Sequence, residues 1–176
     1  MNEHAEQLLA RNRNKGALID TNLLLLLFVG SVRRDLISKF KRVSKFAVED
    51  YDTLFNVVNY FGKIFTTPNI LTEVSNLAGQ LSGADRDDCF ERFATTLTLL
   101  EEKYIPSATV AQSKPFKKFG ITDACIAQIA GQGHLIITDD FPLYHFLIGS
   151  GYDALNFYHL APMNWKFDPK LLPRKQ

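Results

Sequence analysis

The chain has 176 residues, of which 46% are hydrophobic and 22% charged, a composition ordinary for one globular domain with a full core. Its formal charge of +1 neither requires nor excludes a nucleic-acid partner, because acids can concentrate in a site and bases around it. The longest apolar run, residues 23–29, is far shorter than the roughly 20 residues that cross a bilayer, so we expect no membrane association.

The hydrophobic pattern predicts helices alternating with short strands. The first third predicts a polar, partly helical lead-in, a strand, a helix through the apolar run and two further helices (1–15, 16–20, 23–29, 32–46 and 50–61). The middle predicts a strand, a helix opened by a proline, a polar turn, a helix and an edge strand (63–67, 68–81, 82–88, 89–103 and 104–110). The last third predicts a basic loop, a helix, a strand, a helix and a late strand, then a Pro-rich tail (113–120, 122–130, 134–138, 141–150, 154–159 and 161–176).

This order of elements predicts a parallel sheet with helices on both faces. We expect one domain at residues 16–160, between the lead-in (1–15) and the basic tail (161–176). The first sixteen residues are polar, so they do not suit a secretory signal. Cys89 and Cys125 form no CxxC motif, which excludes a zinc finger or disulfide scaffold and favours a reducing, cytoplasmic location.

Four short segments each place an acid where an apolar run gives way to a helix-like pattern. They contain Asp20, Glu73, Asp123 and the pair Asp139 and Asp140. In a parallel sheet, strand ends and helix starts converge on one edge, so these acids can meet in one pocket. Clustered carboxylates repel one another and are costly to bury, so such a pocket calls for a hard divalent cation. The pattern therefore indicates a metal-dependent, phosphodiester-cleaving site.

Taken singly, each acid has a simpler explanation. An Asp at the start of a helix caps free N–H groups and complements the helix dipole. Glu73 suits the first or second turn of a helix, and Asp139 can cap the helix that begins near Pro142. The joint pattern favours a site, because an unpaired charge on an apolar flank is costly.

The four segments, in chain order, are Leu18–Asn22, Thr67–Val74, Gly120–Ala124 and Ile136–Phe141. Their order, spacing and local context resemble the PIN-domain ribonuclease family over about residues 16–160. The resemblance implies a three-layer α/β/α sandwich with a central, mainly parallel sheet. It also implies an endoribonuclease that hydrolyses RNA phosphodiester bonds with Mg²⁺ or Mn²⁺.

The resemblance implies that Asp20, Glu73 and Asp123 are catalytic, metal-holding carboxylates. The fourth position stays open between two neighbours. A Thr-x-Asp pattern selects Asp140, which we favour because it lies nearest the family's usual offset, and a Thr-Asp pattern selects Asp139. The metal is expected to lower the pKa of a water that attacks the phosphorus in line.

Two neighbours of these acids match supporting positions of the family, namely Asn22 and Thr138. The stretch between Asp20 and Glu73 is longer than in compact toxin-type members, with extra basic sequence at residues 32–60. That difference argues against a toxin–antitoxin role and leaves the nuclease chemistry unaffected. The resemblance suggests a homodimer, and an inhibitory protein partner stays open.

We expect two groups of cations to contact RNA phosphates. They are Lys114, Lys117 and Lys118 before the Asp123 segment, and Arg33 and Arg34 at the start of a second basic stretch. A solvated helix face explains the second stretch equally well. Phe116 and Phe119, among the lysines, can either stack on bases or anchor the loop in the core.

Other functions fit less well. A catalytically silent PIN-like module that binds RNA or protein is the main alternative, and its binding should not depend on Mg²⁺ or Mn²⁺. A haloacid-dehalogenase-like site needs Asp-x-Asp after the first strand, but Asn22 stands at the third position. A receiver domain needs an early acidic partner, which Asp20 lacks. Neither a GxGxxG after the first strand nor a P-loop is present.

Overall fold

Five short strands form one sheet in the computed structural model, which describes residues 3–160. They are β1 (Ala17–Ile19), β2 (Ile64–Thr66), β3 (Glu101–Glu102), β4 (Leu135–Thr138) and β5 (Ala154–Asn156). The strand order is β3-β2-β1-β4-β5, and every pair is parallel. The residues of β1, β2, β4 and β5 are all buried, as expected for parallel strands covered on both faces. The predicted tail (161–176) lies outside the described residues.

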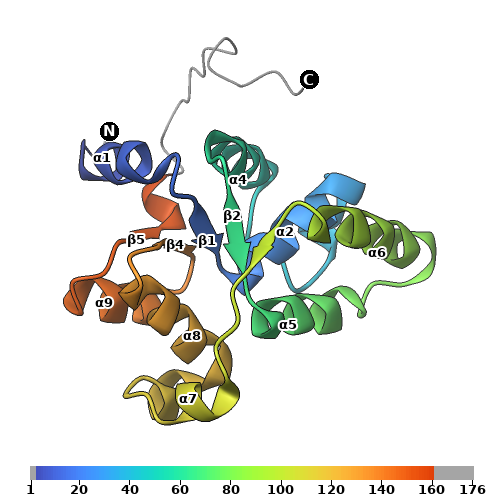
Figure 1. Ribbon diagram of the computed structural model, residues 1–176. Coiled ribbons are helices and arrows are strands. Elements are labelled where there is room, and N and C mark those ends of the chain that lie inside the picture. The colour runs from blue at the N-terminus through green and yellow to red at the C-terminus, as the bar shows by residue number, and fades with distance from the viewer. Residues whose placement is uncertain (1–2, 161–176) are drawn as a thin grey trace.

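Helices cover both faces of this sheet. They are α1 (Glu3–Asn12), α2 (Thr21–Val32), α3 (Leu36–Lys39), α4 (Val48–Tyr60), α5 (Pro68–Ala78), α6 (Gly83–Leu97), α7 (Ser107–Ala111), α8 (Phe116–Gly131) and α9 (Phe141–Gly149), with a 3₁₀ turn η1 (Phe157–His159). Figure 1 shows α2, α5 and α6 on one side of the sheet and α8 and α9 on the other. The predicted three-layer α/β/α sandwich is confirmed, and the sheet is parallel throughout these residues.

The apolar run forms α2, the central helix of its layer. Leu23, Leu25 and Leu26 are fully buried, because α4, α5 and α6 all pack against this helix. Gly30 lies under the ring of Tyr51, and a Cβ at this position would collide with that ring. A glycine inside the helix therefore allows α2 and α4 to approach closely.

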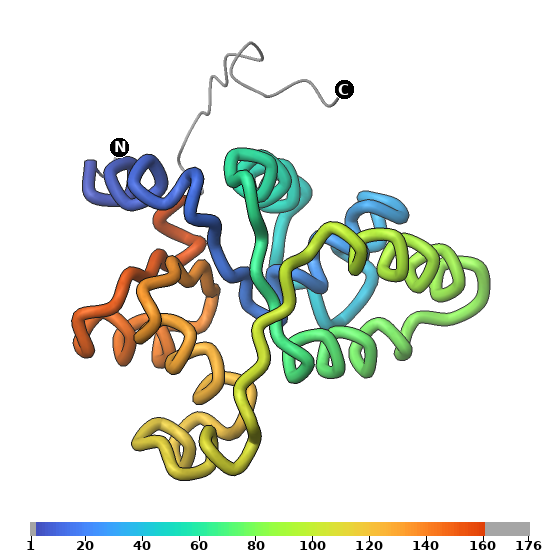
Figure 2. The backbone as a smooth tube through the Cα atoms, in the orientation of Figure 1, coloured from blue at the N-terminus to red at the C-terminus, as the bar shows by residue number. Residues whose placement is uncertain are grey.

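The predicted lead-in is part of the same hydrophobic core. Ala5, Leu8 and Leu9 of α1 are buried. Arg11 pairs with Asp153, just before β5, at 2.6 Å. Figure 2 shows the blue N-terminal helix beside the orange-red segment that contains β5. Packing and an ion pair thus fix the first helix to the last strand. Within residues 3–160, no helix has both the length and the apolar character needed to cross a bilayer.

The structure corrects the predicted helix at residues 32–46. Gly30 and Ser31 do not end the preceding helix, which continues to Val32. Arg33 then takes an extended conformation with φ −153°, so the helical spacing of the following residues produces one turn, α3. Residues 40–46 form turns. The spacing was misleading because buried side chains of an irregular segment can also recur every three or four positions.

The middle of the chain also differs from prediction. The acidic stretch 82–88 is not a turn, because α6 begins at Gly83 with these acids on its solvated face. The edge strand lies at β3, inside the predicted helix 89–103, and residues 104–110 run into α7. The predicted basic loop is helical from Phe116, and Gly120, with φ +78°, kinks α8. Exposed elements such as these have weak hydrophobic patterns, which explains the errors.

Candidate active site

The carboxyl ends of β1 and β4 lie side by side in the middle of the sheet. Ile19 is opposite Ile137, and the backbone N–H of Asp20 donates to the carbonyl of Ile137 at 3.0 Å. The chain therefore leaves both strands at one edge, with Asp20 on one side and Asp140 on the other. The strand order reverses between β1 and β4, and open α/β sheets bind ligands in the crevice at such a point.

Asp20 is a buried carboxylate that begins α2. Its exposed fraction is 4%. Oδ1 accepts a hydrogen bond from the backbone N–H of Thr21 at 2.6 Å, and Oδ2 accepts one from the hydroxyl of Thr138. Burial, together with the charges of Asp139 and Asp140, nevertheless raises the pKa of Asp20 from 3.8 to about 6. The surroundings thus fix this carboxylate in place and disfavour its negative charge.

Asp123 follows the kink in α8. Gly120 separates the first helical turn from the long segment that contains Asp123, whose side chain is half-buried. Burial, together with the smaller effects of the charges of Asp20, Asp140 and Glu73, raises the pKa of Asp123 from 3.8 to about 7. Three carboxylates from three other segments therefore act on this one, so four of the predicted acids share one electrostatic environment.

Glu73 approaches the same edge from α5. Pro68 is the first residue of this helix, and the Thr67 hydroxyl accepts from the backbone N–H of Ile70 at 3.2 Å. One turn further on, exposed Glu73 accepts a hydrogen bond from the Thr21 hydroxyl at 3.3 Å. It also lines a pocket of about 380 Å³ together with Thr122 of α8. Glu73 therefore borders both the acids and an open space where a ligand can enter.

The two candidates for the fourth acid have different surroundings. The Asp139 side chain is 2% exposed and pairs with Lys45, while its Oδ1 is buried without a hydrogen-bond partner among the described residues. Asp140 is half-buried and caps α9 by accepting from the backbone N–H of Leu143 at 2.7 Å. Its charge raises the pKa of both Asp20 and Asp123. Asp139 acts on Asp20 as well, but of the two only Asp140 also acts on Asp123, and within the described part of the chain only Asp139 is paired with a lysine.

The two predicted supporting residues lie within this edge. Thr138 donates to Asp20 and accepts from the backbone N–H of Asp140 at 3.0 Å, so its hydroxyl links two acids from different strands. Asn22 lies half-buried in the first turn of α2, two residues after Asp20.

The predicted RNA-contacting cations fall in two places. Lys117 and Lys118 are exposed in the first turn of α8, the helix of Asp123, and Lys114 is exposed just before it. Arg33 and Arg34 follow the last turn of α2, about 18 Å along the helix axis from Asp20. The structure therefore places the lysines on the helix of one acid and does not bring the two arginines to the acids.

The aromatic residues among the lysines pack against the protein. The ring centroids of Phe119 and Phe146 are 5.3 Å apart, and Lys118 Nζ lies 4.7 Å from the Phe119 centroid. Phe116 packs partly buried against the hydrophobic core. Of the two explanations for these rings, anchoring is the one that these contacts support.

Lys45 is a site residue that the sequence pattern does not single out. It comes from the turns between α3 and α4 and reaches Asp139, 94 positions later in the chain. In the sequence it is one cation in a basic stretch, and no local spacing predicts a contact at this separation.

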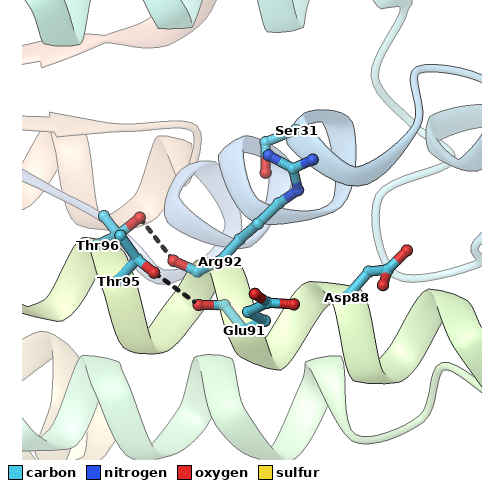
Figure 3. A pocket seen from close by; sticks show the side chains of 6 residues that line it. All are labelled: Ser31, Asp88, Glu91, Arg92, Thr95 and Thr96. Atoms are coloured by element: carbon cyan, nitrogen blue, oxygen red, sulfur yellow. Dashed lines mark hydrogen bonds between the residues drawn. The ribbon is translucent and has the colours of Figure 1, made fainter.

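A second pocket lies at the opposite end of α2. It measures about 470 Å³ and is lined by Ser31 and by α6 side chains, including Arg92 and Thr96 (Figure 3). The hydroxyls of Thr95 and Thr96 donate to carbonyls of their own helix, at 3.1 and 2.8 Å. This pocket lies at the other end of α2 from Asp20, so it contributes nothing to the site at the sheet edge.

The acids are near one another without forming a finished metal site. Among residues 3–160, no three His, Cys, Asp or Glu side chains lie close enough together, as placed, to hold a metal ion. In comparisons with known proteins, the chain matches no family model, no curated protein and no solved structure.

Proposed function

We propose that this protein is a metal-dependent endoribonuclease that hydrolyses RNA phosphodiester bonds. The observation that supports this most strongly is the environment of Asp123, whose pKa is raised to about 7 by burial and by Asp20, Asp140 and Glu73. Groups with strongly shifted pKa values that gather in a crevice are candidates for a functional site. The position at the reversal of strand order points the same way.

The donor set suits Mg²⁺ or Mn²⁺ in kind and in charge. Its donors are carboxylate oxygens, which hard divalent cations prefer. Burial and neighbouring carboxylates raise the pKa of two of these acids to near neutrality, and a bound cation would offset both effects. Asp20, Glu73, Asp123 and Asp140 would hold the ion, with the exposed side chain of Glu73 at the solvent side.

The bound metal would supply a Lewis acid that activates water for attack on the phosphorus and neutralises charge on the phosphate. The chain's own residues position the donors. Thr138 and the backbone N–H of Thr21 orient the two oxygens of Asp20, and the Thr21 hydroxyl orients Glu73. The Lys45 ion pair neutralises Asp139, which keeps one further negative charge away from the substrate phosphate.

Cleavage of labelled RNA tests the proposal. Purified protein is incubated with 5′-labelled RNA in Mn²⁺ and in EDTA, alongside Asp20→Asn. We expect fragments in Mn²⁺ alone, with the variant inactive. Asp85→Asn is a matched control, because Asp85 is an acid paired with Arg33 at the far end of α2. Cleavage that persists in EDTA or in Asp20→Asn would reject the proposal.

A catalytically silent module that binds RNA or protein is the second candidate. Two observations favour it: Asp20 and Asp140 both cap helices, and the acids as placed do not form a metal-holding group within residues 3–160. Such a module should bind RNA equally well in EDTA and in Mn²⁺, and neither Mg²⁺ nor Mn²⁺ should change its melting temperature.

A further inference from the structure

A stack of aromatic rings runs from the core to the surface beside the acids. Phe46 is 4% exposed, and its ring centroid lies 6.5 Å from that of Tyr158, with 18° between the planes. Tyr158 continues to Phe141 at 6.0 Å, with 5° between the planes. Tyr158 and Phe141 are 36% and 45% exposed. Tyr158 thus contacts both other rings, and Phe141, the most exposed of the three, forms the outer end of the stack.

The fold places these rings at the edge of the sheet that contains the acids. Phe141 directly follows Asp140 as the first residue of α9. Tyr158 lies in η1, directly after β5, and Asn156 fixes this turn by accepting from the backbone N–H of Tyr158 at 3.0 Å. Asn156 is opposite Thr138 in the register of β4 and β5. Both rings therefore emerge where β4 and β5 end.

Cationic and polar groups surround the stack. Lys45 Nζ lies 5.1 Å from the ring centroid of Phe46 and pairs with Asp139. The rings of His145 and His159 lie 6.4 and 6.5 Å from the ring of Phe141. These groups can donate hydrogen bonds to phosphate or ribose oxygens, whereas an apolar protein partner would leave them without a match.

An isolated exposed phenylalanine is ordinary on a protein surface. Here two flat rings lie nearly parallel next to a candidate phosphodiester-cleaving site. Every nucleobase has a π-face that can stack on such a ring, and the face is available when the base is unpaired. The occupant that fits flat rings, nearby donors and adjacent acids is therefore a strand with unpaired bases.

We propose that Phe141 and Tyr158 form a platform on which unpaired bases of single-stranded RNA stack, next to the phosphate to be cut. This inference rests on the proposed nuclease function, because it names the substrate class of the same site. It assigns binding to the aromatic pair and leaves the chemistry to the acids. The platform would therefore bind RNA even when no cleavage is possible.

Binding in EDTA tests the platform separately from cleavage. The probe is a 5′-fluorescein-labelled 12-nucleotide uridine RNA, and the readout is fluorescence anisotropy. We expect Phe141→Ala and Tyr158→Ala each to weaken binding about tenfold, and Phe141→Trp to retain it. Ile148→Ala is the matched control, because Ile148 is an exposed apolar residue of the same helix, 41% exposed, and it should bind like the wild type. Thermal melts verify that each variant folds.

Two further probes ask whether the platform contacts bases. The same RNA with abasic nucleotides keeps its phosphates but lacks its bases. It should bind the wild type about tenfold more weakly than intact RNA does, whereas Phe141→Ala should bind the two RNAs equally. A blunt RNA duplex should bind more weakly than the single strand. Equal binding by Phe141→Ala and Ile148→Ala, or duplex binding as tight as single-strand binding, would overturn the platform and favour a protein partner for these rings.

The two proposals fail in different ways. Phe141-dependent binding without any cleavage in Mn²⁺ would support the platform and overturn the nuclease. Cleavage in Mn²⁺ with binding unaffected by Phe141→Ala would support the nuclease and overturn the platform.

Discussion

Charged side chains lie at both ends of α2, and their partners differ. At the C-terminal end, Arg33 pairs with Asp35 and Asp85, Arg34 pairs with Asp52, and none of these side chains is buried. At the N-terminal end, Lys45 pairs with Asp139, but buried Asp20 has no cationic partner within residues 3–160, and Asp140 adds negative charge to its surroundings. The first region is balanced by the protein itself. The second stays unbalanced, which is the expected condition of a site whose positive charge comes from a bound ion.

The largest effect should come from removing one charge at the unbalanced end. Asp20→Asn keeps the shape of the side chain and removes a proposed metal ligand. We expect the rate of RNA cleavage to fall about a thousandfold, because even mutation of a ligand's hydrogen-bond partner costs about 10–100-fold. Single-turnover assays in Mn²⁺ measure this. The same change at the balanced end, Asp85→Asn, should leave the rate unaltered, and equal losses at both ends would remove the distinction between them.

The second effect concerns stability and pH in the absence of metal. The pKa of Asp20 is raised in the folded protein, so the folded state binds more protons than the unfolded state between about pH 4 and pH 7. The free energy of unfolding should therefore decrease as pH rises through 6, by on the order of 2 kcal/mol from Asp20. Urea denaturation in EDTA at pH 4.5 and pH 8 measures the decrease. The decrease should be smaller in Asp20→Asn. A free energy of unfolding that increases toward pH 8 would contradict the burial of the Asp20 carboxylate.

A smaller effect should follow from breaking the ion pair that borders the acids. Lys45→Met leaves Asp139 buried without its cation. We expect a loss of about 1 kcal/mol, because the aspartate is buried but the lysine is half exposed. Adding Asp139→Asn to Lys45→Met should recover most of it, since the remaining charge is then gone. A double-mutant cycle of denaturation midpoints that shows no coupling would mean that the pair is not formed in solution.

The smallest effect is expected at the balanced end of α2. Arg33→Ala and Arg34→Ala each remove exposed pairs, which are worth about 0–1 kcal/mol. The RNA affinity should not change, because these residues lie far along α2 from Asp20. Lys117→Ala with Lys118→Ala should instead weaken RNA binding and lower its dependence on salt concentration. Anisotropy titrations at two salt concentrations compare the arginine and lysine variants. A stronger effect of the arginines would place bound RNA at the C-terminal end of α2, away from Asp20.

Strong hydrophobic patterns allowed most of the fold to be predicted from the sequence. The buried strands β1 and β4 and the apolar helix α2 lie where the patterns placed them. Two of the failures lie in exposed elements: α6 begins at Gly83, and the edge strand occupies residues 101–102, where burial gives the sequence little signal. Gly30 was misinterpreted as a helix end because the close approach of Tyr51 cannot be seen in the sequence.

The candidate site was also predicted only in part. The positions of the acids could be predicted because the ends of parallel strands meet at one edge. The sequence favoured Asp140 over Asp139 from the family's usual offset, but the ion pair that distinguishes Asp139 could not be predicted, because Lys45 lies far away in the sequence. The alignment of Phe141 with Tyr158 is likewise a contact between α9 and η1, and no local pattern encodes it.

Direct measurement of cation binding tests whether Asp20, Glu73, Asp123 and Asp140 share one metal ion. Isothermal titration calorimetry with Mn²⁺ at pH 8 is performed on the wild type, Asp123→Asn and Asp85→Asn. We predict saturable Mn²⁺ binding by the wild type and Asp85→Asn, and loss of that binding in Asp123→Asn. No heat of binding in the wild type, or the same isotherm for all three proteins, would contradict a metal site at this edge of the sheet.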